Sequence, residues 1–148
     1  MDGSRLLERI VEGSSDAIVF CDREGVIRFW SHGAQETFGW SAAEAVGRSL
    51  DIIIPERLRA RHWEGWDGAM KRGSSRYGKE TLAVPAARKD GSSISIEFTI
   101  QLVRDDSGAI LGPAAVIRDV TARFQRDKEL RLRVKELEKR LAEAGLGV

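Results

Sequence analysis

The segment 94–102 constrains the fold of this chain most, because apolar and polar residues alternate along it. Its apolar positions are Ile94, Ile96, Phe98, Ile100 and Leu102. This period-two pattern predicts a strand with one face on a hydrophobic core and the other open to solvent or a partner. Strands of this kind belong to antiparallel sheets, so we expect the chain to contain one.

The remaining pattern places strands at both ends of a helical middle. We expect further strands at 17–22, 26–30, 81–87 and 114–117. The first two flank a short turn that contains Gly25, which is typical of a hairpin. Between residues 31 and 70 the pattern changes to short helices, and Ser41 with Glu44 forms a predicted capping box. The sequence therefore predicts an α+β fold.

Helices flank this unit on both sides. A short amphipathic helix is predicted over 4–11. The segment 123–144 has no Gly or Pro, and its apolar residues recur at spacings of four, three and four: Leu130, Val134, Leu137 and Leu141. This is the seam of a short coiled coil, although packing of the helix on its own domain is an alternative. We expect an N-terminal amphipathic helix in 1–13, one domain in 14–121, a coiled-coil helix in 122–148, and a homodimer.

The composition argues against several classes of function. Of 148 residues, 24 are Lys or Arg and 23 are Asp or Glu, so the net charge of +1 does not favour nucleic-acid binding. No apolar run approaches the roughly 20 residues of a membrane helix, and the N-terminus does not resemble a secretory signal. We expect a cytoplasmic protein. We find no phosphate-binding loop or nucleophile elbow, so we expect no enzymatic activity in this chain.

Six stretches in order resemble the PAS family of sensory domains. They are 16–19 (Asp-Ala-Ile-Val), 22–27 (Asp-Arg-Glu-Gly-Val-Ile), 38–41 (Phe-Gly-Trp-Ser), 44–48 (Glu-Ala-Val-Gly-Arg), 88–91 (Arg-Lys-Asp-Gly) and 118–121 (Arg-Asp-Val-Thr). The resemblance implies a five-stranded antiparallel sheet with short helices on one face. It also implies a dimeric module that binds a small ligand, or nothing, and relays a change through Asp119 and Thr121 to a C-terminal coiled coil. An effector such as a kinase or cyclase would lie outside this chain.

The helix after Pro55 carries the main candidate ligand. Leu58, His62, Trp66 and Ala69 fall on one helical face, so the imidazole should face an apolar interior. A core histidine held by a hydrogen bond is one explanation. However, the segment 54–62 resembles the one that bears the proximal heme histidine in oxygen-sensing PAS kinases and related phosphodiesterases. That resemblance implies heme b with His62 as the ligand of its iron.

The chain also departs from these heme-binding relatives. The position of the kinases' oxygen-binding arginine is Leu82, and that of the phosphodiesterases' methionine ligand is Glu80. Without the arginine, we expect sensing of carbon monoxide or nitric oxide to be less affected than sensing of oxygen. Tyr77 is a candidate distal donor and Arg76 a candidate propionate partner. The predicted pocket wall on the last two strands consists of Phe98, Ile100 and Val116.

Other ligands and an empty pocket are alternatives. Cysteine-dependent flavin photochemistry is excluded because 47–54 contains no cysteine, and Cys21 is expected to be a buried apolar residue. Zinc is not expected, because the histidines are only His32, on the surface, and His62. The alternative function is a cofactor-free PAS module for dimerisation or binding of a small apolar metabolite, its pocket narrowed by Trp63, Trp66 and Tyr77.

Overall fold

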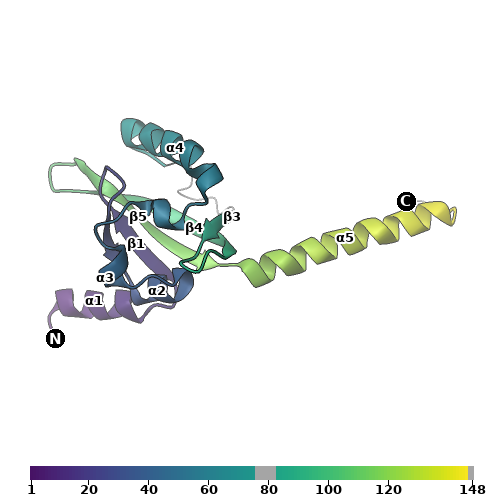
Figure 1. The fold of residues 1–148 in the computed structure, drawn as a ribbon, viewed down its shortest axis with the longest axis horizontal. Helices are drawn as coiled ribbons and strands as arrows, with labels where there is room; N and C mark the ends of the chain where they lie inside the picture. Colours follow the sequence, from purple (N-terminus) through teal and green to yellow (C-terminus); the bar gives the residue numbers. More distant parts are fainter. Residues whose placement is uncertain (76–82, 147–148) are drawn as a thin grey trace.

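The computed structural model describes residues 1–75 and 83–146. A globular unit of short helices and a sheet carries one long helix that projects away from it (Figure 1). The elements in chain order are α1 (Gly3–Gly13), β1 (Ala17–Cys21), β2 (Ile27–Trp30), α2 (His32–Phe38), α3 (Ala42–Ala45), η1 (Leu50–Ile53), η2 (Glu56–Leu58), α4 (Arg59–Arg72), β3 (Val84–Ala87), β4 (Ser93–Arg104), β5 (Ile110–Asp119) and α5 (Thr121–Glu143).

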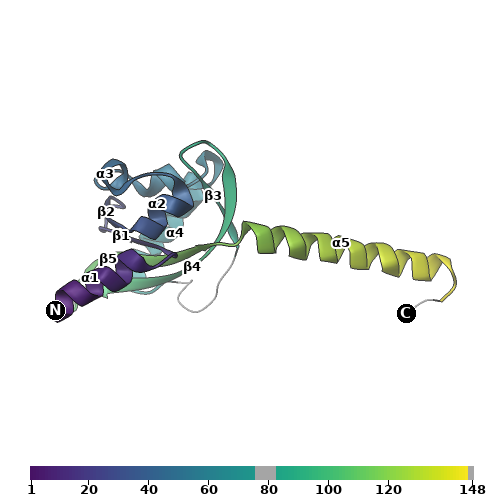
Figure 2. The same cartoon turned by 90° about the horizontal axis from the view of Figure 1, so that it is seen from below.

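The five strands form one antiparallel sheet in the order β2-β1-β5-β4-β3. Helices α2, α3 and α4 lie on one side of this sheet, which we call its inner face (Figure 2). The opposite side, the outer face, carries the polar positions of the alternating strand β4. The predicted five-stranded antiparallel sheet with short helices on one face is confirmed.

The hydrophobic core lies between the inner face and α2. Phe38 and Ile27 are completely buried, and the ring of Phe38 lies 5.5 Å from that of Trp30. Buried Ser31 caps α2 and accepts hydrogen bonds from the backbone N–H groups of Ile18 and Ala34 at 2.9 and 3.2 Å. Because both donors are satisfied, this polar side chain ties α2 to β1 without leaving an unpaired group in the core.

Local sequence signals explain the helix ends and turns. The capping box of Ser41 and Glu44 is present, as predicted. Lys89 bonds the Glu44 carboxylate at 2.5 Å, and this contact lowers the pKa of Glu44 to about 2. In the β1–β2 turn, Gly25 has a φ of +82°, a conformation that residues with a side chain rarely adopt.

The two terminal helices pack little on the globular unit. No residue of α1 or α5 is buried, and the seam residues of α5 are 39–60% exposed: Leu130, Val134, Leu137 and Leu141. An apolar stripe of this kind on an isolated helix needs a partner helix to become buried. Among the described residues, no helix is long and apolar enough to cross a membrane.

Candidate ligand-binding site

The inner face of β4 is closed at one end and open at the other. Ile94 and Ile96 are only 8% and 5% exposed. Farther along the strand, Phe98, Ile100 and Leu102 are half-buried, although the alternation places them on the same face. Helix α4, which lies on this side of the sheet, has no fully buried residue. The apolar side chains on this part of β4 are therefore covered incompletely by the described helices.

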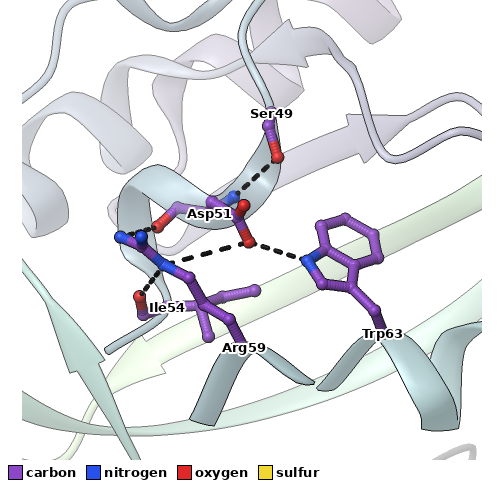
Figure 3. A network of polar contacts seen from close by, with 5 residues as sticks. All are labelled: Ser49, Asp51, Ile54, Arg59 and Trp63. Carbon is purple, nitrogen blue, oxygen red and sulfur yellow. Dashed lines mark hydrogen bonds and ion pairs between the residues drawn. The ribbon is translucent and has the colours of Figure 1, made fainter. Parts of the chain in front are cut away.

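Two tryptophans anchor α4 to the rest of the domain. The indole Nε1 of Trp63 donates to Asp51 Oδ1 at 2.7 Å (Figure 3). Trp66 Nε1 donates to the carbonyl oxygen of Arg23 at 2.9 Å. The ring of Trp63 also lies on Gly25, where an added Cβ would meet its atoms at 2.2 and 2.4 Å. Trp63 is thus bonded to η1 and packs on the β1–β2 turn, and Trp66 is bonded to the β1–β2 turn.

Asp51 is the centre of the network that joins η1 to α4 (Figure 3). Its backbone N–H donates to Ser49 Oγ, which caps η1. Arg59, the first residue of α4, donates to the carbonyl oxygens of Ile54 and Asp51 at 3.1 and 3.2 Å. The Arg59 guanidinium also lies 4.0 Å from the Asp51 carboxylate. The start of α4 is therefore held by groups on η1 and its C-terminal neighbour.

His62 lies within this framework, and its Nδ1 atom lacks a hydrogen-bond partner among the described residues. Its ring packs against Trp63 and Trp66, with centroids 4.7 and 5.8 Å away. In the described chain, its Nδ1 atom is buried and has no partner, so a core histidine satisfied through this atom is not what the structure contains. Burial lowers the pKa of His62, and the nearby Asp51 carboxylate opposes this only in part. The imidazole is consequently neutral near pH 7, the form in which histidine binds metals.

The structure brings together part of the predicted site. Leu58 and Trp66 pack against the core, and Phe98 and Ile100 lie on the inner face. The prediction for Val116 is wrong, because this residue lies on the outer face and is 46% exposed. The strand alternates so that Ala115 and Ile117 face inward instead. Arg76, Tyr77, Glu80 and Leu82 lie outside the described residues.

The junction between β5 and α5 has the predicted hydrogen bonds. Asp119 Oδ1 accepts from the backbone N–H and the hydroxyl of Thr121 at 2.9 and 2.5 Å. The Thr121 hydroxyl in turn accepts from the backbone N–H of Ser95 on β4 at 3.0 Å. Sequence reasoning missed a second contact, in which Arg123 bonds Glu97 of β4. Both contacts fix the first turn of α5 to β4.

The other candidate ligands find little support in the described residues. Cys21 is buried, and burial raises its pKa to about 12, so the thiol stays protonated as predicted. His32 is exposed and lies 3.1 Å from Glu36. The described part of the chain contains no group of three or more His, Cys, Asp or Glu placed to hold a metal ion.

Comparison with known proteins identifies the fold. The family model of the PAS fold matches residues 5–120. The chain belongs to the PAS family. The Sensor protein FixL of Bradyrhizobium diazoefficiens is 28% identical over 84% of this chain and 24% of its own length. The Oxygen sensor protein DosP of Escherichia coli is 23% identical over 76% of this chain and 14% of its own length. This PAS chain therefore spans a quarter or less of these curated relatives.

Solved structures support the same fold. A PAS domain from Colwellia psychrerythraea has a TM-score of 0.71 at 22% identity and covers 82% of this chain and 99% of its own. An RNA-binding Light-Oxygen-Voltage receptor has a TM-score of 0.74 at 23% identity and covers 90% of this chain and 37% of its own. The chain thus shares its fold with these two structures, and PAS domains serve in sensing and signalling.

Proposed function

We propose that this PAS domain is a heme-based gas sensor in which His62 is the axial ligand of the iron. The observation that carries the proposal is a neutral, half-buried imidazole on α4, which packs against the rings of Trp63 and Trp66 and whose Nδ1 atom has no hydrogen-bond partner among the described residues. Buried polar atoms without a partner are rare in proteins, and one reason for them is a ligand that is absent. The resemblance of the segment 54–62 to heme-binding PAS sensors supports the same assignment.

The residues around His62 fit such a group. Histidine nitrogen is a common axial ligand, and an apolar surrounding leaves the opposite coordination position to a diatomic gas. Phe98 and Ile100 provide an apolar wall that is open in the described structure. The indole N–H groups of Trp63 and Trp66 donate to Asp51 and to the carbonyl oxygen of Arg23, so both rings are held in place beside His62. When bound, heme would supply an iron atom that coordinates the gas.

The protein's own residues connect this site to α5. Asp51 and Arg59 hold the start of α4, so His62 is presented from a fixed helix. Phe98 and Ile100 belong to β4, the strand that also carries Ser95 and Glu97. These last two residues bond the first turn of α5. A ligand that displaces the inner side of β4 therefore acts on the helix through a single strand.

The relay needs a second copy of the chain. The seam residues of α5 are exposed, so a homodimeric coiled coil would bury them and provide the element that a displacement of β4 turns or shifts. An effector domain such as a kinase or cyclase, outside this chain, would receive that change. In this proposal the chain acts in the cytoplasm and performs no catalysis itself.

An absorption spectrum tests the heme proposal. We expect protein expressed with added hemin to show a Soret band that His62→Ala abolishes or shifts. His32→Ala is the matched control, because His32 is exposed and its loss should leave the spectrum unchanged. A wild-type protein that folds and shows no Soret band, or a band insensitive to His62→Ala, would overturn the proposal.

A cofactor-free module that binds a small apolar metabolite is the second candidate. The observation that favours it is the packing of Trp63 and Trp66 against the His62 ring, which narrows the space at α4. Native mass spectrometry of the purified protein would detect a retained metabolite as an added mass. A bound small molecule without a Soret band would favour this candidate over heme.

A further inference from the structure

A hollow of about 360 Å³ opens on the surface where the segments on either side of α3 meet η1 and the start of α4. We call it the Trp40 hollow, and it is lined by Trp40, Arg48, Ser49, Asp51, Ile52 and Arg59. Figure 3 shows three of these residues, Ser49, Asp51 and Arg59. The volume is in the range of about 300–1,000 Å³ that is usual for small-molecule sites. Because neither His62 nor any residue of β4 lines it, the hollow is a different site from the one at His62.

Arg48 is a cation for which the described residues supply no counter-charge. Its guanidinium lies over the Trp40 ring, with the Cζ atom 4.6 Å from the ring centre, which is a cation–π contact. The residue is exposed, and within the described chain its side chain forms no ion pair and no hydrogen bond. A guanidinium over a ring keeps its N–H groups in its own plane, where they can bind both oxygens of a carboxylate. Trp40 therefore positions a set of donors that has no acceptor in the described structure.

The other two charged residues of the Trp40 hollow are already engaged with each other. The Arg59 guanidinium lies 4.0 Å from the Asp51 carboxylate, and Asp51 Oδ1 also accepts from Trp63. Two arginines and one aspartate give the hollow a net charge of +1, and the pairing of Asp51 with Arg59 leaves that charge on Arg48. Ser49 Oγ accepts from the Asp51 backbone N–H at 3.1 Å, and its hydroxyl hydrogen has no acceptor among the described residues.

Apolar surface lies beside Arg48 in the same hollow. Trp40 and Ile52 both line it, and both are half-buried. Each of them also packs against the hydrophobic core, so their positions are fixed by the fold. A ligand with one negative charge and a flat apolar group would therefore match the charge and the apolar surface together.

We propose that the Trp40 hollow binds a small aromatic monocarboxylate. The carboxylate binds the guanidinium of Arg48 through two parallel hydrogen bonds, and the Ser49 hydroxyl offers a further donor. The aromatic ring covers the half-buried surface of Ile52 and Trp40. A dianion such as phosphate fits less well, because its second charge would lie in the same hollow as the Asp51 carboxylate. This site is additional to the proposed heme site.

Titration with benzoate, followed by the NMR signals of the indole N–H groups, tests the proposal. The chain has four tryptophans, and the indoles of Trp30, Trp63 and Trp66 donate to oxygen atoms. Trp40 Nε1 is buried and has no partner among the described residues, so its signal should be resolved from the other three. We expect benzoate to shift the Trp40 signal until it saturates at millimolar concentration. A folded protein whose Trp40 signal does not respond would overturn the proposal.

Two arginine variants show whether benzoate occupies the Trp40 hollow. Arg48→Gln should weaken binding about tenfold or more, because it removes a charge-assisted pair of hydrogen bonds. Arg57→Gln is the matched control, since Arg57 is also exposed but does not line the hollow. Equal weakening by both variants would contradict the site. Shifts of the Trp63 and Trp66 signals that Arg48→Gln leaves unchanged would place benzoate at α4 and would also contradict it.

Two further anions test the class of ligand. Acetate carries the same charge without a ring, so it should bind severalfold more weakly than benzoate, and inorganic phosphate should bind more weakly as well. Phosphate or acetate that binds as tightly as benzoate would overturn the assignment to an aromatic monocarboxylate. All of these titrations use cofactor-free protein, so they succeed or fail independently of the heme spectrum.

Discussion

The two ends of the inner face differ in how completely they are packed. At the α2 end, Phe38, Ile27 and Trp30 are almost inaccessible to solvent. At the α4 end, Phe98 and Ile100 are half-buried, and no residue of α4 is fully buried. The polar groups follow the same division. Ser31 in the closed end accepts two hydrogen bonds from backbone N–H groups, whereas His62 in the open end has a nitrogen without a partner among the described residues.

This difference separates the part of the domain that specifies the fold from the part that is available to a ligand. A closely packed core contains few voids larger than a water molecule, so it leaves no room for a ligand. At the open end, α4 is held instead by two hydrogen bonds, from Trp63 to Asp51 of η1 and from Trp66 to Arg23 of the β1–β2 turn. We call these contacts the rim of the open end. Helix α4 can therefore lie over the inner face of β4 without packing closely on it.

The largest expected effect is that of truncation at the closed end. Phe38→Ala should lower the free energy of unfolding by about 3–5 kcal/mol, because a fully buried ring leaves a cavity. Phe98→Ala, at the open end, should cost only about 1–2 kcal/mol in cofactor-free protein, since this residue is only partly buried. Urea unfolding of both variants checks the comparison. Equal losses would mean that the two ends are packed alike.

A second pair of variants tests the rim. Gly25 and Gly47 both have positive φ, +82° and +94°, so alanine at either position is strained by about 1 kcal/mol. At Gly25 the new methyl group would also collide with the Trp63 ring, whereas no atom lies within 4 Å at Gly47. Gly25→Ala should therefore cost about twice as much as Gly47→Ala in thermal unfolding. Similar costs would show that the indole moves aside freely.

The sequence predicts the closed end better than the open one. Alternation on β4, the hairpin around Gly25 and the Ser41 capping box are local signals, and each is present in the structure. The assignment of Val116 fails for a physical reason. In a strand of alternating polarity, the apolar positions indicate which residues face the core. The segment 114–117 is apolar throughout, so its composition does not show which residues face inward. Only the pairing of Val116 with Thr99 and Ile18 shows that its side chain lies on the outer face.

The contacts of Trp63 with Asp51 and of Asp16 with Arg118 lie beyond local patterns altogether. Trp63 and Asp51 are separated by helical turns and a loop, and Asp16 bonds Arg118 from the other end of the chain. A signal for the second pair does exist, because both residues adjoin the predicted strands 17–22 and 114–117, whose counterparts β1 and β5 are neighbours in the sheet of this fold. The orientation of His62 within the aromatic cluster required the coordinates, since a helical face says which side a ring is on and not what it contacts.

A smaller effect is expected from the hydrogen bonds at the rim. Trp63→Phe keeps an aromatic ring but removes the bond to the Asp51 carboxylate, at a cost of about 1 kcal/mol. Trp66→Phe removes an exposed bond to a backbone carbonyl and should cost a few tenths of a kcal/mol, roughly. Thermal unfolding and the intrinsic fluorescence of each variant provide the measurements. The reverse order of costs would place the anchor of α4 at Trp66.

The smallest effect concerns protonation of His62. Because burial lowers its pKa in the folded state, the unfolded chain binds the proton more readily as the pH falls below the ordinary value of about 6.5. The stability of the cofactor-free protein should therefore be fully present above that pH and decline as the pH falls toward the lowered pKa. Between about pH 7 and pH 5, the melting temperature of His62→Gln should fall less steeply with falling pH than that of the wild type. His32→Gln, which alters an exposed ring, should keep the wild-type slope. If both variants keep that slope, the His62 ring is solvated rather than enclosed, and the open end does not present a neutral nitrogen to a ligand.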